Sequence, residues 1–322
     1  MGVGPGSLVW TSPNTFVATA NAAILLGARV DFVDVDYSTG SMSLDLLKKK
    51  LSSASENNQL PDLVVPVHFS GASVDMADLK KLASKYGFKI VEDASHALGG
   101  KAHGNQVGSA IYSDVCVSSF HAIKMITTGE GGVALTNNRI LHERMQRFRS
   151  HGITSDRDLM TSGDVDEIWN YQQIDIGFNF RMTEFQAALG RSQLKRLSSF
   201  VEKRKSVMDF YRSNLNPAFE ILDIPGGAES TFHLAVIRVH EEAVGMTQKA
   251  VYRELLDHGI EANLHYIPVH LHPYYRAKGF VLGDFPNAER HFRTSISLPV
   301  HANLTRRELQ RVVTVLNDLC SV

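Results

Sequence analysis

The sequence predicts an α/β fold, with a large domain built on a mainly parallel sheet and a smaller α+β domain after it. Two observations predict this fold. Short apolar runs typical of buried strands alternate with amphipathic helical patterns through the first 200 residues. Polar and small residues follow several of these runs, and the carboxyl ends of parallel strands usually line a ligand crevice. We expect residues 1–200 to form the large domain and residues 201–322 the small domain.

The large domain contains alternating strands and helices, and two of its helices have clear stop signals. Gly27 and Gly87 follow helical patterns, and glycine readily adopts the left-handed conformation that ends a helix. Lys48 to Lys50 is expected to form the solvated last turn of the second helix. Residues 161–171 are polar and should form a loop. Strands are expected at 8–11, 30–35, 63–67, 89–93, 115–117 and 133–136, and helices at 16–26, 44–51, 76–86, 139–149 and 183–200.

The small domain begins where the long helical pattern gives way to a second helix, closely followed by Pro217 and Pro225. Its first helix is expected near 201–215. Strands are then predicted at 231–239 and 260–265, and helices at 247–258 and 306–320. The last helix is amphipathic, which predicts one buried face.

The composition excludes several functional classes. The 322 residues carry a formal net charge of −1, so no overall field attracts nucleic acid or an anionic membrane. We find no apolar run long enough to span a bilayer and no secretory signal pattern near Met1. Cys116 and Cys320 form neither a disulfide framework nor a metal motif. We therefore expect a cytoplasmic protein.

Lys124 is the first candidate for catalysis. It follows an apolar strand and small hydroxyl residues, and it lies between Ile123 and Met125 just before a glycine-rich turn. Burial there would disfavour its ammonium form, and a neutral lysine amine can attack a carbonyl. The alternative is a lysine at a strand end that extends its charge into solvent.

Asp93 is the second candidate. It ends a predicted strand, so it should lie at the same edge of the parallel sheet as Lys124. A lysine in imine linkage and an aspartate facing a pyridinium nitrogen are the two groups that a pyridoxal phosphate (PLP) site requires. The alternative is that Asp93 caps a helix.

Several motifs together resemble the PLP-dependent sugar aminotransferases of the DegT/DnrJ/EryC1/StrS family, which have the aspartate-aminotransferase fold (fold type I). The family-like motifs are Ser119 five residues before Lys124, the run at 92–96, and the run at 177–182. The resemblance covers the chain from Gly2 to about Leu319. It is closest to the branch of pseudaminic acid synthesis, through residues 9–18, 120–132 and 149–154.

The resemblance assigns roles around the cofactor. It implies that Lys124 forms the Schiff base with PLP and later carries a proton, that Asp93 pairs with the pyridine nitrogen, and that Ser119 donates to the phosphate. For Ser119, the alternative is a local capping role.

Three further residues are assigned by the same resemblance. Phe16 corresponds to the aromatic that stacks on the PLP ring, and His96 to the group near its phenolic oxygen. Asn179 corresponds to an asparagine that reaches the phosphate of the neighbouring subunit's cofactor, which implies a homodimer with shared active sites. For Phe16, the alternative is ordinary core packing.

A histidine-rich segment follows in the small domain. The resemblance places His265 and Tyr266 in a loop near the nucleotide sugar. His265, His270 and His272 could instead bind a metal, since imidazole is a common ligand, although no carboxylate or cysteine lies nearby in the sequence. We predict no metal.

His151 and Arg181 could contact the carboxylate of the amino donor or the diphosphate of the sugar, because arginine binds both anions in a bidentate manner. Ordinary surface pairing is the alternative for both residues.

The reaction implied by the resemblance begins with L-glutamate, which gives its amino group and leaves as 2-oxoglutarate. The amine then passes to the C4 ketone of a UDP-linked 4-keto-6-deoxy-N-acetyl-hexosamine for surface glycans. Amination at C3 and other sugars remain alternatives. Family dehydratases carry histidine where this chain has Lys124, which argues against dehydration.

By comparison with the family, we expect this sequence to lack an N-terminal strand and helix whose turn holds the cofactor phosphate. This leaves open a non-catalytic paralogue that dimerises but binds PLP poorly.

Overall fold

The computed structural model describes residues 1–161 and 167–320; part of the predicted 161–171 loop therefore lies outside the described residues. Its main sheet has the strand order β2-β1-β3-β4-β7-β8. Neighbouring strands are parallel except for β7 and β8, which confirms the mainly parallel sheet. The strands are β1 (Leu8–Thr11), β2 (Arg29–Phe32), β3 (Leu63–Val65), β4 (Lys89–Asp93), β7 (Val115–Ser119) and β8 (Gly132–Leu135).

Helices cover both faces of this sheet because alternate strand residues point to opposite sides. One face packs against α2 (Leu44–Glu56) and α3 (Met76–Tyr86), through strand residues Trp10, Val64 and Ile90. The other face, through Val9 and Val65, packs against α1 (Val17–Leu25). Between α1 and α4 (Arg139–Arg149), this second face borders a mostly apolar cavity of about 540 Å³ that reaches Asp93.

Two helix predictions in the large domain are wrong in extent. Lys48 to Lys50 do not end α2, because its apolar face continues to Ala54; Lys50 instead donates to the Phe32 carbonyl at 2.6 Å. The pattern at 183–200 is interrupted, giving α5 (Glu184–Leu194) and α6 (Leu197–Asn214). The break allows Leu197 at the start of α6 to pack closely on Gly99.

The small domain is built on the antiparallel sheet β11-β13-β14. Helices α6, α8 and α11 contribute side chains to the hydrophobic core beside it. The predicted domain boundary at residue 200 falls within α6, and we propose the two domains on either side of it. The elements are β11 (Phe219–Ile221), β13 (Ala235–Val239), β14 (Ser295–Leu298), α7 (Glu241–Val244), α8 (Gln248–Asp257), α9 (Pro273–Arg276), α10 (Pro286–Thr294) and α11 (Arg306–Asp318).

Two strand predictions in this domain are also corrected. The 231–239 strand begins only at Ala235, because the amides of Thr231 and Leu234 donate to carbonyls of the large domain. The 260–265 segment makes a single bridge, from Asn263 to β14, instead of a strand. Its next amides are engaged by side chains: Leu264 binds the Asn263 side chain and Tyr266 binds Asn14.

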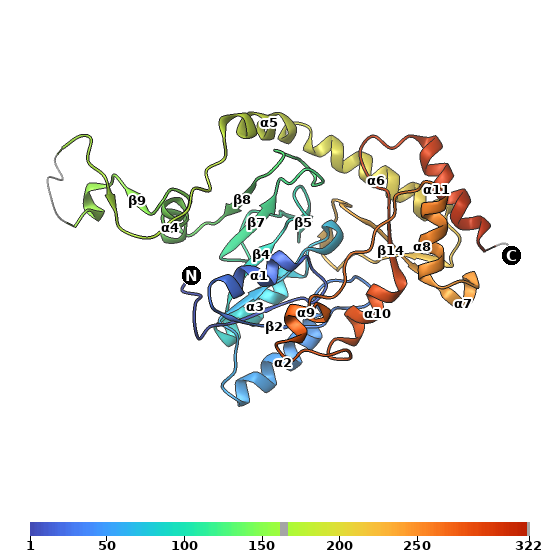
Figure 1. Cartoon of the computed structure of the whole chain (residues 1–322), viewed down its shortest axis with the longest axis horizontal. Helices are drawn as coiled ribbons and strands as arrows, with labels where there is room; N and C mark the ends of the chain where they lie inside the picture. The colour runs from blue at the N-terminus through green and yellow to red at the C-terminus, as the bar shows by residue number, and fades with distance from the viewer. Residues whose placement is uncertain (162–166, 321–322) are drawn as a thin grey trace.

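Figure 1 shows how the remaining segments are arranged. The part of the chain that contains β9 projects from the body on the side opposite α11, and α5 leads back from it to α6. We call this part of the chain, residues 150–161 and 167–183, the arm. It is joined to the rest of the chain at α4 and α5. The short strands are β9 (Ile153–Thr154), β10 (Gln172–Gln173), β5 (Lys101–Ala102), β6 (Asn105–Gln106) and β12 (Ala228–Glu229).

Candidate active site

Lys124 lies in a turn that follows β7. The turn is closed by the amide of Phe120, which donates to the Gly131 carbonyl at 2.8 Å, and by the Lys124 amide, which donates to His121 at 3.0 Å. The Lys124 side chain is half-buried, and Met125 beside it is buried. Burial lowers the pKa of Lys124, and the nearby Asp93 carboxylate partly offsets this by raising it. The lysine is therefore partly desolvated, and Asp93 is the opposing charge that acts on it.

Asp93 is the last residue of β4, and both of its carboxylate oxygens accept hydrogen bonds. The Thr19 hydroxyl on α1 donates to Oδ2 at 2.6 Å, and the Ser95 hydroxyl donates to Oδ1 at 2.6 Å. The Ser95 amide also donates to Oδ1, at 3.1 Å. A turn follows Asp93, so the alternative of a helix cap is wrong. These hydrogen bonds fix the carboxylate at the carboxyl end of β4.

Three imidazole rings, those of His96, His233 and His265, lie within electrostatic reach of the Lys124 amine. The rings of His96 and His233 lie 4.4 Å apart, and the Tyr266 hydroxyl lies 3.1 Å from His96 Nε2. Burial lowers the pKa of His96 and His233 well below the usual range, and it lowers that of His265 to about 4. The Lys124 ammonium charge is a smaller contributor to the lowering of all three pKa values. These imidazoles are consequently neutral near pH 7.

Ser119 is the last residue of β7, and Phe16 lies between β1 and α1. Phe16 immediately precedes α1, and its ring centroid is 6.4 Å from that of Tyr266. Its side chain is 61% exposed, so the alternative of core packing is wrong. The Ser119 hydroxyl accepts from the His121 amide at 3.2 Å, as a local cap would, and its own hydrogen remains able to donate outward.

Asn179, Arg181 and His151 lie together in another part of the protomer, on the arm. The His151 amide donates to the Phe178 carbonyl at 2.9 Å, and Ser150 forms an isolated bridge with Asn179. All three candidate side chains are exposed. Within a single chain, these three arm residues therefore lie apart from the site that contains Lys124 and Asp93.

The histidines of the small-domain segment bind different partners. His265 Nδ1 lies 2.8 Å from the Ser297 hydroxyl, whereas His270 Nε2 lies 3.0 Å from the buried Glu289 carboxylate. The Glu289 carboxylate lies 19 positions after His270 in the sequence, outside the histidine-rich segment. Within residues 1–161 and 167–320, no group of three histidine, cysteine or acidic side chains is placed to hold a metal.

Sequence reasoning missed several residues of this site. Thr19 binds Asp93 across 74 positions of sequence, and His233 reaches His96 from the small domain, so neither has a local signal. Ser95 has one, because a serine two residues after an aspartate commonly donates back to it. A search for short Asp-x-Ser patterns after strands could have found it.

The sequence model of the DegT/DnrJ/EryC1/StrS aminotransferase family matches residues 1–317. The chain belongs to this family. It is 33% identical over 313 residues to the UDP-4-amino-4,6-dideoxy-N-acetyl-beta-L-altrosamine transaminase of Campylobacter jejuni strain 81-176, covering 96% of this chain and 78% of the relative. As a DegT/DnrJ/EryC1/StrS protein, the chain is a sugar aminotransferase with the PLP-dependent transferase fold.

Solved structures agree with this assignment. Helicobacter pylori PseC, an aminotransferase involved in pseudoaminic acid biosynthesis, has a TM-score of 0.85 and 31% identity; the match covers 98% of this chain and 80% of PseC. Spr1654 of Streptococcus pneumoniae, in its PLP form, has a TM-score of 0.83 and 27% identity, covering 99% of this chain and 82% of that one.

PLP is the cofactor of this family, and the residues present fit it. The site offers a half-buried amine, a carboxylate with both oxygens fixed, and a hydroxyl at the end of the adjacent strand, which are the kinds of group that a PLP site uses. The buried Nδ1 atom of His96 makes no hydrogen bond among the described residues, and it lies in the same cluster.

Proposed function

We propose that this sugar aminotransferase takes the amino group of L-glutamate, releases 2-oxoglutarate, and aminates the C4 ketone of a UDP-linked 4-keto-6-deoxy-N-acetyl-hexosamine for pseudaminic acid. The observation that carries the proposal is the half-buried Lys124 amine beside Asp93. The choice of sugar is supported by the names of the relatives from Campylobacter jejuni and Helicobacter pylori.

The proposed roles combine the contacts of these residues with the family resemblance. When bound, PLP supplies a carbonyl group that reacts with amines and a ring that withdraws electrons. The lowered pKa of Lys124 raises the fraction of neutral amine, so Nζ can take a proton from the α-carbon of the donor and return it later. Asp93 would hold the protonated pyridine nitrogen, Ser119 the phosphate, and Phe16 the ring face.

The remaining groups are proposed to face the substrate. The Tyr266 hydroxyl and the His96 ring would lie near the phenolic oxygen and the nucleotide sugar. Because the His96 imidazole is neutral, it can donate or accept a hydrogen bond without adding a positive charge to the site. His265 would line the same side. Arg181 and His151, on the exposed arm, are proposed to bind the anionic groups of substrate in an assembled dimer.

The test of this function is amination of defined nucleotide sugars. Purified protein with PLP and L-glutamate is incubated with the UDP-linked 4-keto sugar or with its 3-keto isomer, and products are identified by mass spectrometry and NMR. We expect a kcat/KM for the 4-keto sugar at least about tenfold higher. Preferred amination at C3 would reassign the substrate, and a lack of 2-oxoglutarate with either sugar would support the non-catalytic alternative.

We propose that the active form is a homodimer joined through the arm. Phe178 and Phe180 are 55% and 70% exposed, with stacked rings 4.7 Å apart, and Phe185 on α5 is 91% exposed. Exposed aromatic clusters of this kind mark protein interfaces. Asn179 lies between the two stacked rings in sequence, so a second copy seated here would receive it.

Replacing Phe178 and Phe180 together by aspartate should convert the dimer to a monomer and remove most of the activity. Sedimentation velocity measures the assembly, and Leu256→Asp, at a 46% exposed position on α8, serves as the control that stays dimeric. A double variant that remains dimeric would show that the interface lies elsewhere.

We also propose a cytoplasmic location, supported by the two free cysteines, Cys116 and Cys320. Separately, none of the described helices is long and apolar enough to cross a membrane. Recovery of the native protein in the cytosolic fraction of its cells would support the location, and recovery elsewhere would contradict it.

A further inference from the structure

The peptide group between His265 and Tyr266 is held from both sides by buried side chains. His291 Nε2 lies 3.2 Å from the His265 carbonyl oxygen, and the Tyr266 amide donates to Asn14 Oδ1 at 3.1 Å. The exposed fractions of Asn14 and His291 are 1% and 0%. Neither residue has a role in the site described above, yet together they satisfy both polar atoms of this one peptide group.

The orientation of the Asn14 amide is fixed by its second hydrogen bond. Asn14 Nδ2 donates to the Gly40 carbonyl at 2.8 Å, so Oδ1 must be the atom that faces the Tyr266 amide. The neighbouring Pro13 carbonyl accepts from the Val269 amide at 2.8 Å. The loop after β1 thus binds the 266–269 segment at two points.

The protonation of His291 is fixed in the same way. Burial is the main cause that lowers its pKa to about 4; the hydrogen bond to the His265 carbonyl opposes this and the Arg238 charge adds to it, so the ring is neutral near pH 7. A carbonyl oxygen only accepts, so the proton is on Nε2. Nδ1 then accepts from the Ser295 hydroxyl at 3.3 Å, and the ring packs edge-on against Phe69, with centroids 5.4 Å apart.

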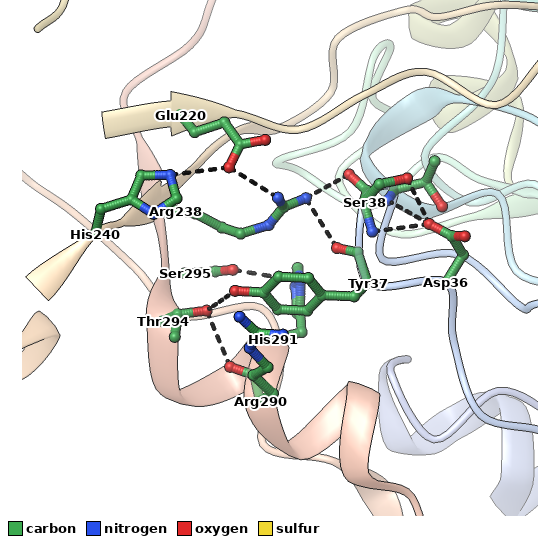
Figure 2. Close-up of polar contacts among 11 residues, drawn as sticks. Asp36, Tyr37, Ser38, Glu220, Arg238, His240, Arg290, His291, Thr294 and Ser295 are labelled. Atoms are coloured by element: carbon green, nitrogen blue, oxygen red, sulfur yellow. Dashed lines mark hydrogen bonds and ion pairs between the residues drawn. The ribbon is translucent and has the colours of Figure 1, made fainter. Parts of the chain in front are cut away.

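Figure 2 shows the polar contacts around His291 and the neighbouring Arg238. The buried Arg238 guanidinium donates to the carbonyls of Tyr37 and Ser38, at 2.8 and 2.5 Å, in the loop that leads to Gly40. The Tyr37 ring lies between Arg238 and Arg290, at 4.4 and 4.1 Å from its centroid, which joins this loop to α10. The loop that binds Asn14 and the helix that carries His291 are therefore linked.

We infer that Asn14 and His291 are positioning residues that fix the backbone of Tyr266 and so direct its hydroxyl toward His96. The hydroxyl lies 3.1 Å from His96 Nε2, and its place depends on the one peptide group that both residues bind. The inference rests on the proposed role of Tyr266 beside the nucleotide sugar. It adds two residues that should govern the sugar half of the reaction.

The first measurement is amide hydrogen exchange in the protein without added cofactor, followed by mass spectrometry of peptides covering 264–268. Asn14→Ala should exchange the Tyr266 amide at least about tenfold faster than the wild type, because its acceptor is lost. Tyr211→Phe, which removes a buried hydrogen bond to the Pro299 carbonyl in the same domain, is the matched control and should leave this peptide unchanged. Unchanged exchange in Asn14→Ala would overturn the inference.

The second measurement is a double-mutant cycle with Tyr266→Phe. Asn14→Ala and His291→Leu should each lower kcat/KM for the keto sugar about 10- to 100-fold in the wild type, as expected for a misplaced group, but less than about threefold in the Tyr266→Phe background. His291→Gln keeps a donor near the His265 carbonyl and should recover much of the loss. Equal losses in both backgrounds would show a merely structural role and overturn the inference.

If Asn14→Ala does not fold, Asn14→Ser replaces it in both experiments, with the same expected results. If the wild type aminates no sugar, the proposed function fails, and the exchange experiment alone decides whether Asn14 positions Tyr266.

Discussion

Lys124→Ala should abolish transamination, with a fall in kcat of roughly 10⁴-fold or more, because it removes both the nucleophile and the group that moves the proton. The lysine is half-buried, its pKa is lowered by burial, and Asp93 is the opposing charge. The measurement is the visible absorption of purified protein mixed with PLP, before and after L-glutamate. Wild type should show a band of bound cofactor that L-glutamate bleaches, and Lys124→Ala should show neither the band nor the bleaching.

Two further variants separate the chemistry from general effects. Lys80→Ala, at an exposed position on α3, removes one lysine far from the turn and should match the wild type. Lys124→Arg keeps the charge, but a guanidinium cannot act as the amine nucleophile, so it should be as inactive as the alanine variant. A glutamate-sensitive band in Lys124→Ala would assign the catalytic amine to another residue.

Asp93→Asn should lower the transamination rate roughly 10²- to 10³-fold, because a neutral amide cannot stabilise a protonated pyridine nitrogen. The amide also offers fewer acceptors, so the Thr19 or the Ser95 hydroxyl would lose its partner. We also expect weaker retention of PLP during dialysis, measured by the absorbance that remains with the protein.

The same variant should change Lys124 in a defined direction. The Asp93 carboxylate raises the pKa of Lys124 against the larger effect of burial, so removing that charge should lower the pKa further. In protein without cofactor, the rate at which an amine-specific reagent labels Lys124 should therefore level off at lower pH in Asp93→Asn. Asp45→Asn, at an exposed position on α2, is the control. A shift to higher pH would mean that Asp93 does not face the lysine amine.

The order and type of most elements could be predicted from the sequence because local patterns determine them. The helix at 76–86 was predicted with both ends correct, since Gly87 takes the left-handed conformation after it. The alternation of strand and helix patterns predicts the mainly parallel sheet, and Trp10 and Val9 are buried on its opposite faces. Lys124 and Asp93 could be paired in advance for the same reason: carboxyl ends of parallel strands share one edge.

The lengths of several elements depend on contacts between residues that are distant in sequence. The segment at 260–265 has a strand pattern, yet it forms one bridge, and the Tyr266 amide just after it binds the Asn14 side chain. The long helical pattern at 183–200 breaks at Lys195, and Leu197 at the start of the next helix lies close to Gly99. Sequence alone could not predict these two contacts, because Asn14 and Gly99 lie far along the chain from their partners.

The sequence by itself therefore determined the parallel sheet, the family motifs, and the two residues, Lys124 and Asp93, on which the proposed chemistry depends. Only the tertiary structure decided that Thr19 fixes Asp93, that His233 lies beside His96, and that Asn179 pairs with Ser150. The physical reason is that periodicity reports which face of an element is buried, whereas hydrogen bonds between distant residues depend on how whole elements pack.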